Sequence, residues 1–329
     1  MAKPWKGRKV LVTGGSGFIA SHLCRRLVQE GAKVFVLTKY HSVIDNVRLS
    51  GCWGHLTPVE ADLRNPDSLA QLRAIKPAVV YHFAAYNHVG DSFLHVSEAI
   101  DVNGKGTANL LEAYGGYERF IYISSSEVYG YQRRVPFAEE ATPCPISPYA
   151  IGKYAGELYA RMTWHVRRKP VVVLRPFNAF GPYQSPRAII AELILKCLRG
   201  EDVVTTKGVQ TREFNYVGDL VEGFLAAARA PRAVGEVINL GSGREVAIRD
   251  LARTIHRLTG SRSRLQIGKL PYRPTEIWRM AADGRKAKRL LGWSPTVTLE
   301  AGLAKTIAWY RRFDQAFLNP DSALGRLGA

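Results

Sequence analysis

A run of closely spaced glycines near the N-terminus, between Thr13 and Gly17, constrains the fold more than any other feature of the chain. Residues 8–12 (RKVLV) are apolar and β-branched, which is typical of a buried strand. Residues 18–31 then place apolar side chains at helical spacing and end at a glycine. A strand, a glycine turn and a helix N-terminus in this order form a binding site for the pyrophosphate of a dinucleotide.

The glycines follow the spacing G-x-x-G-x-x-A, with Gly14, Gly17 and Ala20 at the fixed positions. Alanine can stand at the last position because only close packing of the helix against the strand is needed there. We therefore expect Gly14, Gly17, Phe18 and Ile19 to bind the cofactor. Taken alone, the segment has an alternative interpretation, a tight turn that binds no ligand.

The second predicted strand, AKVFVLTK, ends without the acidic residue that would hydrogen-bond an adenosine ribose. Thr38 stands at that position and Lys39 follows it. A carboxylate would repel a 2′-phosphate, whereas a small polar residue followed by a lysine tolerates or attracts one. The sequence therefore favours NADP over NAD, although an exposed lysine can also be an ordinary solvated side chain.

Tyr149 and Lys153 lie four residues apart in SPYAIGKYAGE, so a helix places the phenol and the ammonium on one face. A nearby cation and a bound pyridine nucleotide favour the phenolate and lower the pKa of the tyrosine. A phenol is normally protonated near neutrality, and this shift would make it a usable base. A lone YxxxK usually marks a solvated helix face, but here it follows both the glycine turn and the serine-rich segment YISSSEVYG.

The chain also contains, in order, the segments ADLR, HFAA, SSSEVYG, LRPFNAFGP and TREFNYVGDL. With the glycine turn and YxxxK, this set resembles the extended short-chain dehydrogenase/reductase family, and within it the nucleotide-sugar epimerases and dehydratases, from about Lys9 to Tyr310. The resemblance implies an α/β fold: a Rossmann-type, doubly wound parallel sheet that holds NAD or NADP tightly. It also implies a smaller C-terminal region that binds a nucleoside diphosphate sugar. We expect a nucleotide-binding domain over 1–178 and a mainly substrate-binding region over 179–329, with segments returning to the sheet.

The same resemblance implies roles for individual residues. Tyr149 would deprotonate the sugar 4-hydroxyl, Lys153 would bond the nicotinamide ribose, and Ser125 would share the proton with the substrate oxygen. Further cofactor contacts are implied for Asp62, Leu63, Ala84 and Ala85. Contacts to the substrate phosphates are implied for Asn178, Arg212 and Arg273, where a planar guanidinium suits a diphosphate better than lysine does.

Glu127 decides which reaction the sequence favours. A 4-epimerase needs no carboxylate beside Ser125, whereas a 4,6-dehydratase must remove the C5 proton and protonate the departing C6 hydroxyl. Two-residue spacing in an extended segment would place Ser125 and Glu127 on one face. The S-S-E sequence resembles the T-S-E of GDP-mannose 4,6-dehydratases and UDP-glucuronate decarboxylases and departs from the T-D-E of the dTDP-glucose type. We predict a 4,6-dehydratase; the alternatives are a 4-epimerase, in which Glu127 is structural, and then a decarboxylase.

His88 has two interpretations, because the segment NHVGDSF resembles the S-H-V-x-x-S segment of the dehydratases. It could contact the substrate, but a lone histidine in a loop is more often a structural hydrogen-bonding group. The four cysteines, Cys24, Cys52, Cys144 and Cys197, have no metal-binding spacing and are expected to be reduced thiols, as in the cytoplasm. We expect no metal site.

The formal net charge of +18 raises the question of a nucleic-acid or membrane partner. The basic residues are spread over the predicted helices without a cluster interleaved with aromatic residues, so we expect neither partner. No apolar run is long enough to cross a bilayer. A catalytically silent relative that senses NADP is a further alternative, which the intact Ser125, Tyr149 and Lys153 disfavour.

The resemblance also implies a homodimer that pairs two helices from each subunit. The predicted helices cover SFLHVSEAIDVNGKGTANLLEAY and PYAIGKYAGELYARMTWHV. In the second, Tyr154, Leu158 and Met162 form an apolar stripe. The stripe could serve a subunit interface or pack within its own chain, and both interpretations remain open at the level of sequence.

Overall fold

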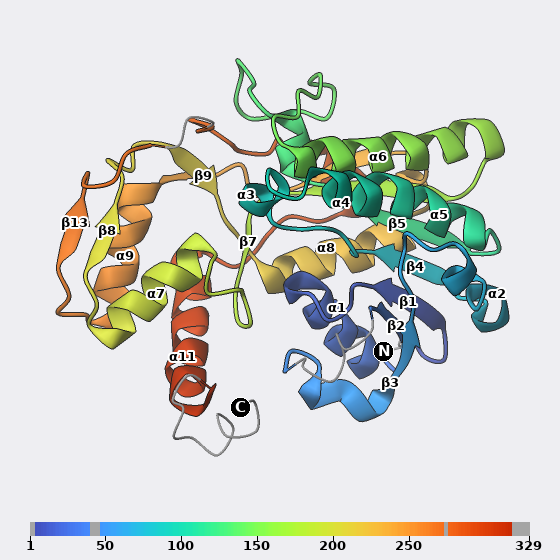
Figure 1. Cartoon of the computed structure of the whole chain (residues 1–329), viewed down its shortest axis with the longest axis horizontal. Coiled ribbons are helices and arrows are strands. Elements are labelled where there is room, and N and C mark those ends of the chain that lie inside the picture. Colours follow the sequence, from blue (N-terminus) through green and yellow to red (C-terminus); the bar gives the residue numbers. More distant parts are fainter. Residues whose placement is uncertain (1–3, 40–46, 273–275, 318–329) are drawn as a thin grey trace.

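A seven-stranded parallel sheet forms the centre of the protein (Figure 1). The computed structural model describes residues 4–39, 47–272 and 276–317. The strand order is β11-β6-β5-β4-β1-β2-β3, and every neighbouring pair is parallel. The strands are β1 (Lys9–Thr13), β2 (Lys33–Thr38), β3 (Leu56–Glu60), β4 (Val79–His82), β5 (Arg119–Ile123), β6 (Val171–Pro176) and β11 (Val237–Leu240). The predicted α/β fold with a doubly wound parallel sheet is confirmed.

Helices cover both faces of the sheet. Figure 1 shows α4, α5 and α6 on one side and α1 and α8 on the other. The helices that flank the sheet are α1 (Phe18–Gln29), α2 (Leu72–Ile75), α3 (Val89–Ser92), α4 (Val96–Ile100), α5 (Gly106–Ala113), α6 (Pro148–Arg167), α8 (Val217–Arg229) and α10 (Arg285–Leu291). Two apolar cores result, one around Leu23 and Phe224 and the other around Leu110 and Ala160. Because both faces are buried, the strands are nearly continuous apolar runs rather than alternating ones.

The second half of the chain contributes to both lobes. Strand β11 pairs with β6 at the edge of the central sheet, and α8 and α10 pack onto the same core. A smaller lobe contains the helices α7 (Ile189–Arg199), α9 (Ile248–Thr259) and α11 (Leu299–Phe317). Its short strand pairs are β8 (Val203–Thr205) with β13 (Leu265–Ile267), β9 (Thr211–Glu213) with β12 (Glu245–Ala247), and β7 (Ala179–Phe180) with β10 (Asn215–Tyr216).

The smaller lobe has an apolar core of its own, because its helices each bury one face. Ile194 of α7, Leu251 and Ile255 of α9 and Leu303 of α11 are fully buried in it. Glycine or a basic residue ends several of these helices; for example, Gly200 terminates α7 in the left-handed conformation. Within the described residues, no helix is both long and apolar enough to cross a membrane.

The connections of the sheet fix where a ligand can bind. From β1 the chain builds outward to β2 and β3 on one side, and then to β4, β5 and β6 on the other. In open parallel sheets of this kind, ligands bind beyond the carboxyl ends of the strands, at the point where the strand order reverses. That point lies between β1 and β4, next to the glycine turn.

Candidate active site

A cavity of about 590 Å³ opens at the carboxyl edge of the sheet. It is lined by residues that directly follow or end six of the seven strands, which is why positions far apart in sequence meet there. The predicted site residues that line it are Gly14, Gly17, Phe18, Ile19, Thr38, Lys39, Asp62, Leu63, Ala84, Ala85, Ser125, Glu127, Tyr149, Lys153 and Asn178. His88 and Arg212 are not among the lining residues, and Arg273 lies outside the described residues.

The glycine turn at the cavity floor requires its first glycine. Gly14 has φ of 63°, and a Cβ atom there would lie 2.8 Å from the Cα atom of Ala84. Gly17 donates its N–H to the carbonyl of Gly14 at 2.8 Å and caps α1. The first N–H groups of α1, at Phe18 and Ile19, have no partner within the helix and line the cavity. The turn can therefore bind a pyrophosphate.

A buried hydrogen-bond group holds the turn against the next strand. The hydroxyl of Thr13 lies 2.7 Å from Nδ1 of His82 and accepts the N–H of Ala84 at 3.0 Å. Nε2 of His82 lies 3.0 Å from the hydroxyl of Thr107. Burial lowers the pKa of His82 well below its ordinary value, so its imidazole is neutral at physiological pH. These side chains fix the distance between the two strand ends that flank the ligand.

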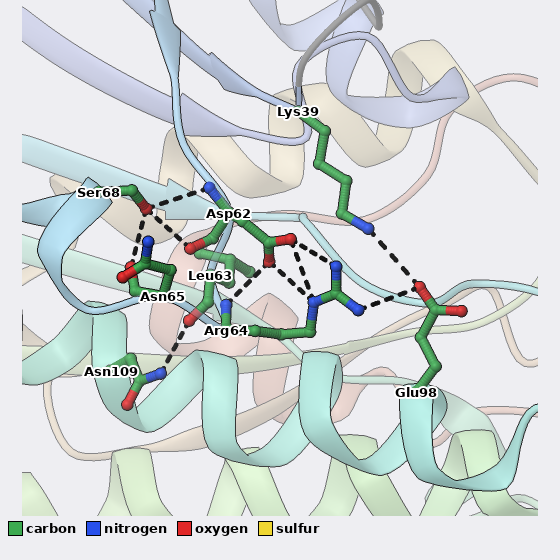
Figure 2. Close-up of polar contacts among 8 residues, drawn as sticks. All are labelled: Lys39, Asp62, Leu63, Arg64, Asn65, Ser68, Glu98 and Asn109. Carbon is green, nitrogen blue, oxygen red and sulfur yellow. Dashed lines mark hydrogen bonds and ion pairs between the residues drawn. The ribbon is translucent and has the colours of Figure 1, made fainter.

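Charged side chains from three elements meet at the end of the cavity next to β2 (Figure 2). The carboxylate of Asp62 accepts three hydrogen bonds from the guanidinium of Arg64, at 2.6–3.1 Å. Glu98 of α4 lies 3.6 Å from Nζ of Lys39 and 3.7 Å from Nη1 of Arg64. The pKa of Asp62 is lowered to about 2, chiefly by the hydrogen bonds from Arg64. Thr38 is buried beside this group.

Ser125 and Tyr149 meet at the opposite end of the cavity. Ser125 follows β5 and its hydroxyl accepts the N–H of Glu127 at 3.2 Å. Tyr149 lies in the first turn of α6, whose N-cap Ser147 accepts the N–H of Ala150 at 3.1 Å. The phenol of Tyr149 is hydrogen-bonded with Ser125, yet burial raises its pKa to about 12. We expected the neighbouring lysine and a bound nucleotide to lower this pKa, but in the structure burial and the charge of Glu127 raise it, and the hydrogen bond with Ser125 opposes them.

Lys153 is buried one turn after Tyr149, with its ammonium 4.6 Å from the ring centre of Tyr122. Burial lowers the pKa of Lys153 to about 7, and the charge of Glu157 opposes this change. Glu157 is itself fully buried and pairs with Arg175, with contacts of 2.5 and 3.0 Å. The carboxylate of Glu157 also accepts a hydrogen bond from the hydroxyl of Ser124 at 2.7 Å, which fixes the end of β5 beside the cavity.

Glu127 lies in the cavity, but on a different backbone from the one we expected. Ser125 is extended, whereas residues Ser126–Tyr129 form a 3-10 turn, so the predicted extended segment over Glu127 is wrong. Ser125 and Glu127 both still line the cavity, and the hydroxyl of Ser125 caps the turn by accepting the N–H of Glu127. Burial raises the pKa of Glu127, the charge of Arg212 lowers it, and the carboxylate of Glu276 raises it again.

The residues assigned to the substrate phosphates are engaged within the protein. Asn178 lines the cavity and donates to the carbonyl of Glu213 at 3.0 Å. Arg212 pairs with Glu276 at 2.6 Å, behind Glu127. The side chain of His88 accepts the N–H of Asp91 at 3.0 Å and so caps α3, which is the structural role considered for it.

Several participants gave no recognisable signal in the sequence. Glu98 reaches the cavity from a helix distant in sequence. Arg64 is the last residue of the motif ADLR, in which the resemblance assigns roles only to Asp62 and Leu63. The pair Glu157–Arg175 could have been suspected only from the acid one turn after Lys153. No group of metal-binding side chains occurs in the part of the chain that the structure describes. The four cysteines are free thiols, with only Cys144 exposed.

Comparison with known proteins agrees with this arrangement. The family model described as GDP-mannose 4,6 dehydratase matches residues 11–306. A dTDP-glucose 4,6-dehydratase of Streptomyces niveus is 34% identical and covers 97% of this chain and 98% of its own length. The dTDP-glucose 4,6-dehydratase DesIV of Streptomyces venezuelae, solved with NAD and TYD bound, has a TM-score of 0.86 at 30% identity, covering 93% of this chain and 98% of its own.

A third relative carries out a different reaction on the same fold. The UDP-glucose 4-epimerase of Thermotoga maritima, solved with UDP-glucose, has a TM-score of 0.86 at 30% identity and covers 92% of this chain and 99% of its own. Dehydratases and epimerases are thus similar to this chain to nearly the same degree. The chain belongs to the GDP-mannose 4,6 dehydratase family, a group of nucleotide-sugar dehydratases and epimerases within the extended short-chain dehydrogenases/reductases.

Proposed function

We propose that the protein is a nucleoside diphosphate sugar 4,6-dehydratase. The observation that carries this proposal is the carboxyl group of Glu127, which is partly buried and shares the cavity with Ser125 and Tyr149. Because burial raises its pKa above the ordinary value of a glutamate, this carboxyl group accepts a proton more readily than an exposed carboxylate does and can return it to the substrate. A 4-epimerase has no step that needs such a group.

The cavity supports an order of proton transfers for its own residues. Tyr149 accepts the proton of the sugar 4-hydroxyl, and Ser125 hydrogen-bonds the oxygen that becomes a ketone. Glu127 then removes the C5 proton, which the ketone has made acidic, and gives it to the C6 oxygen, so that the C6–O bond breaks and water leaves. A nicotinamide dinucleotide in this cavity would supply the hydride chemistry, taking up a hydride from C4 and returning it to C6. C5 would then take up one proton from solvent, which balances the proton released from the 4-hydroxyl through Tyr149. Lys153 holds the nicotinamide ribose and supports the phenolate of Tyr149.

The cavity also fits the cofactor by the character of its lining. The N-terminus of α1 lines the cavity and would bind the pyrophosphate, and Thr38 and Lys39 line the end of the cavity where the adenosine ribose would lie. We propose a tightly bound nicotinamide dinucleotide, with NADP favoured over NAD because no acid stands at Thr38. DesIV was solved with NAD, so the preference is a point on which this chain can differ from its relatives.

The sugar nucleotide would occupy the side of the cavity next to the smaller lobe. We propose contacts from Asn178, from Arg212 after release from Glu276, and from Arg273 and His88. Under this proposal, residues 1–178 would bind mainly the cofactor, and residues 179–329 would bind mainly the substrate. Arg212 would then bind the diphosphate while its charge still acts on the carboxyl group of Glu127.

A homodimer is the assembly that the surface favours. Helix α6 exposes Ile151, Leu158 and Val166, and the neighbouring segment exposes Leu94 and Val96. Figure 1 shows α4 and α6 side by side on the outer face of the sheet, as a two-helix surface requires. We propose that two copies pair this surface. Tyr154, in contrast, packs against an apolar cluster of its own chain.

The test is mass spectrometry of products from GDP-, UDP-, dTDP- and CDP-hexoses, and from UDP-hexuronates, in deuterated water. A 4,6-dehydratase gives a product lighter by one water that retains solvent deuterium. An isomer of unchanged mass without deuterium at C5 would instead identify a 4-epimerase, and loss of carbon dioxide from a UDP-hexuronate a decarboxylase. Glu127→Gln sharpens the test: it should still oxidise C4 but lose no water. Full turnover by this variant would contradict the dehydratase proposal.

A further inference from the structure

The charged group around Glu98 is built from residues that the proposed reaction does not use. Lys39 follows β2, Arg64 follows β3, and Glu98 projects from α4 (Figure 2). Lys39 and Glu98 line the cavity, and the guanidinium of Arg64 lies between Asp62 and Glu98. Three separate elements thus bring two cations and two carboxylates to the end of the cavity where the adenosine ribose would lie.

The two carboxylates are held very differently. The carboxylate of Asp62 accepts hydrogen bonds from Nε and Nη2 of Arg64, and it also accepts the backbone N–H of Arg64 at 2.9 Å. Glu98 contacts the two cations only at 3.6 and 3.7 Å, beyond hydrogen-bond length, and its side chain is 40% exposed. Exposed ion pairs of this length contribute little stability. Glu98 is therefore the anion that a ligand can displace.

The ligand that matches this position is a phosphate monoester. Such a group carries a charge of about −1.5 to −2 at neutral pH and offers three acceptor oxygens, against the single charge of a carboxylate. The guanidinium of Arg64 would keep its hydrogen bond from Nη2 to Asp62 and donate an N–H of Nη1 to the phosphate. Lys39, which is about half exposed, can reach from the other side. No carboxylate on β2 opposes this, because Thr38 stands there.

We propose that Lys39 and Arg64 form the binding site for the 2′-phosphate of NADP, and that Glu98 is the anion that this phosphate displaces. The proposal rests on the dinucleotide site of the proposed function and adds the residues that decide between its two cofactors. Glu98 limits the difference in affinity between NADP and NAD. Its carboxylate neutralises the two cations when NAD is bound and is displaced by the 2′-phosphate when NADP is bound. Lys39, Arg64 and Glu98 thereby determine a specificity that Thr38 only permits.

The experiment is a calorimetric titration of the full-length protein, freed of nucleotide, with NADP, NAD, 2′,5′-ADP and 5′-ADP. The wild-type protein should bind NADP more tightly than NAD and 2′,5′-ADP more tightly than 5′-ADP. Lys39→Met and Arg64→Met should each weaken the affinity for NADP by about tenfold or more, as expected for the loss of one charge-assisted hydrogen bond. The affinity for NAD should change by less than about threefold in each variant. Glu98→Gln should raise the affinity for NADP several-fold. Added salt should reduce the difference in affinity between NADP and NAD.

A matched control comes from the adjoining helical turn. Lys105 pairs with Asp101 at 3.5 Å, is exposed, and does not line the cavity, so Lys105→Met should leave both affinities unchanged. A weaker affinity for NAD in Glu98→Gln, together with a wild-type preference for NAD, would overturn the proposal. Glu98 would then be the carboxylate that binds the ribose hydroxyls in place of an acid on β2.

The outcome for this site is separable from the outcome for the reaction. If the protein releases water from a sugar nucleotide but Lys39→Met and Arg64→Met do not affect NADP, the phosphate site is wrong and the dehydratase stands. If both variants weaken NADP but no sugar nucleotide loses water, the phosphate site stands and the dehydratase fails.

Discussion

At the scale of single residues, burial dominates the proton affinities of the catalytic group. The pKa of Lys153 is lowered to about 7 and that of Tyr149 is raised to about 12, so both shifts favour the uncharged form. The charged forms that the reaction needs must therefore be stabilised by specific partners. Ser125 hydrogen-bonds the phenol, and Glu157 supplies the opposite charge near the ammonium.

Replacing Tyr149 by phenylalanine tests the base directly. Tyr149→Phe keeps the ring and removes the hydroxyl, so we expect turnover to fall by about 10²- to 10⁴-fold, the usual contribution of a general base. Cofactor affinity should stay within a few-fold of the wild type, as measured by calorimetric titration beside the product assay. Tyr131→Phe, at an exposed tyrosine outside the cavity, is the matched control. Unimpaired turnover in Tyr149→Phe would mean that another group accepts the proton.

Lys153 makes the stability of the nucleotide-free protein depend on pH. An unfolded chain keeps this lysine protonated up to about pH 10.4, whereas the folded protein releases the proton near pH 7. Between these values the unfolded state binds more protons, so the free energy of unfolding rises with pH, by at most about 1.4 kcal/mol per pH unit. The penalty of the buried charge is fully present below pH 7.

Urea unfolding at several pH values between 7 and 10 measures this slope. We expect Lys153→Met to remove it, because methionine fills similar space without a titrating group. The difference between the two proteins isolates Lys153 from other groups that titrate in this range. Parallel curves for wild type and variant would show that the ammonium is charged throughout this range in the folded protein.

At the scale of elements, close contact between helices positions the catalytic residues. Helix α6 carries Tyr149 and Lys153 and also has glycines at Gly152 and Gly156, which face the segment joining α4 and α5. A Cβ atom at Gly156 would lie 2.5 Å from the carbonyl oxygen of Asn103 and 2.6 Å from the hydroxyl of Tyr122. The two glycines thus allow α6 to lie against its neighbour with Lys153 directed at the cavity.

Gly156→Ala tests this contact against intrinsic helix propensity. Alanine is favoured over glycine inside a helix by about 1 kcal/mol, but the backbone carbonyl of Asn103 leaves no room for the methyl group. We expect a net loss of about 1–3 kcal/mol in the free energy of unfolding, measured by urea titration, together with weaker cofactor binding. Gly51→Ala, where a Cβ atom would meet nothing within 4 Å, should change stability little. A more stable Gly156→Ala protein would show that propensity outweighs the contact.

At the scale of the whole molecule, the lobes place chemistry and assembly on different surfaces. The cavity opens at the carboxyl edge of the sheet, whereas α6 also presents an exposed apolar face on the outside of the molecule. Leu158 is 46% exposed and Val166 71% exposed on that face. One helix therefore contributes to the site at its first turns and to the proposed dimer along its length.

Leu158→Glu tests the dimer. A carboxylate on each copy would be buried next to its symmetry mate, so we expect the protein to become a monomer in light scattering after gel filtration. Val209→Glu, at an exposed valine of the smaller lobe, is the control and should leave the mass unchanged. A wild-type protein with the mass of one chain at all concentrations would contradict the proposed assembly.

The sequence alone determined the features that depend on local pattern. The motifs and the resemblance that they carry predicted the doubly wound sheet, and the glycine spacing predicted the turn in which Gly14 has a φ of 63°. The resemblance of the motifs named most of the cavity-lining positions from Thr38 to Asn178, and these positions meet because parallel strands end at one edge of the sheet. Each of these follows from neighbours in the chain or from the geometry of a parallel sheet.

Tertiary structure alone decided which distant charges meet. Only the fold brings Glu98 between Lys39 and Arg64, pairs Glu157 with Arg175, and places Arg212 against Glu276. The 3-10 turn at Glu127, where we expected an extended segment, is by contrast a local feature, since the hydroxyl of Ser125 caps it. Pair electrostatics and burial depend on distances between elements far apart in sequence, and the pattern of a single sequence does not specify those distances.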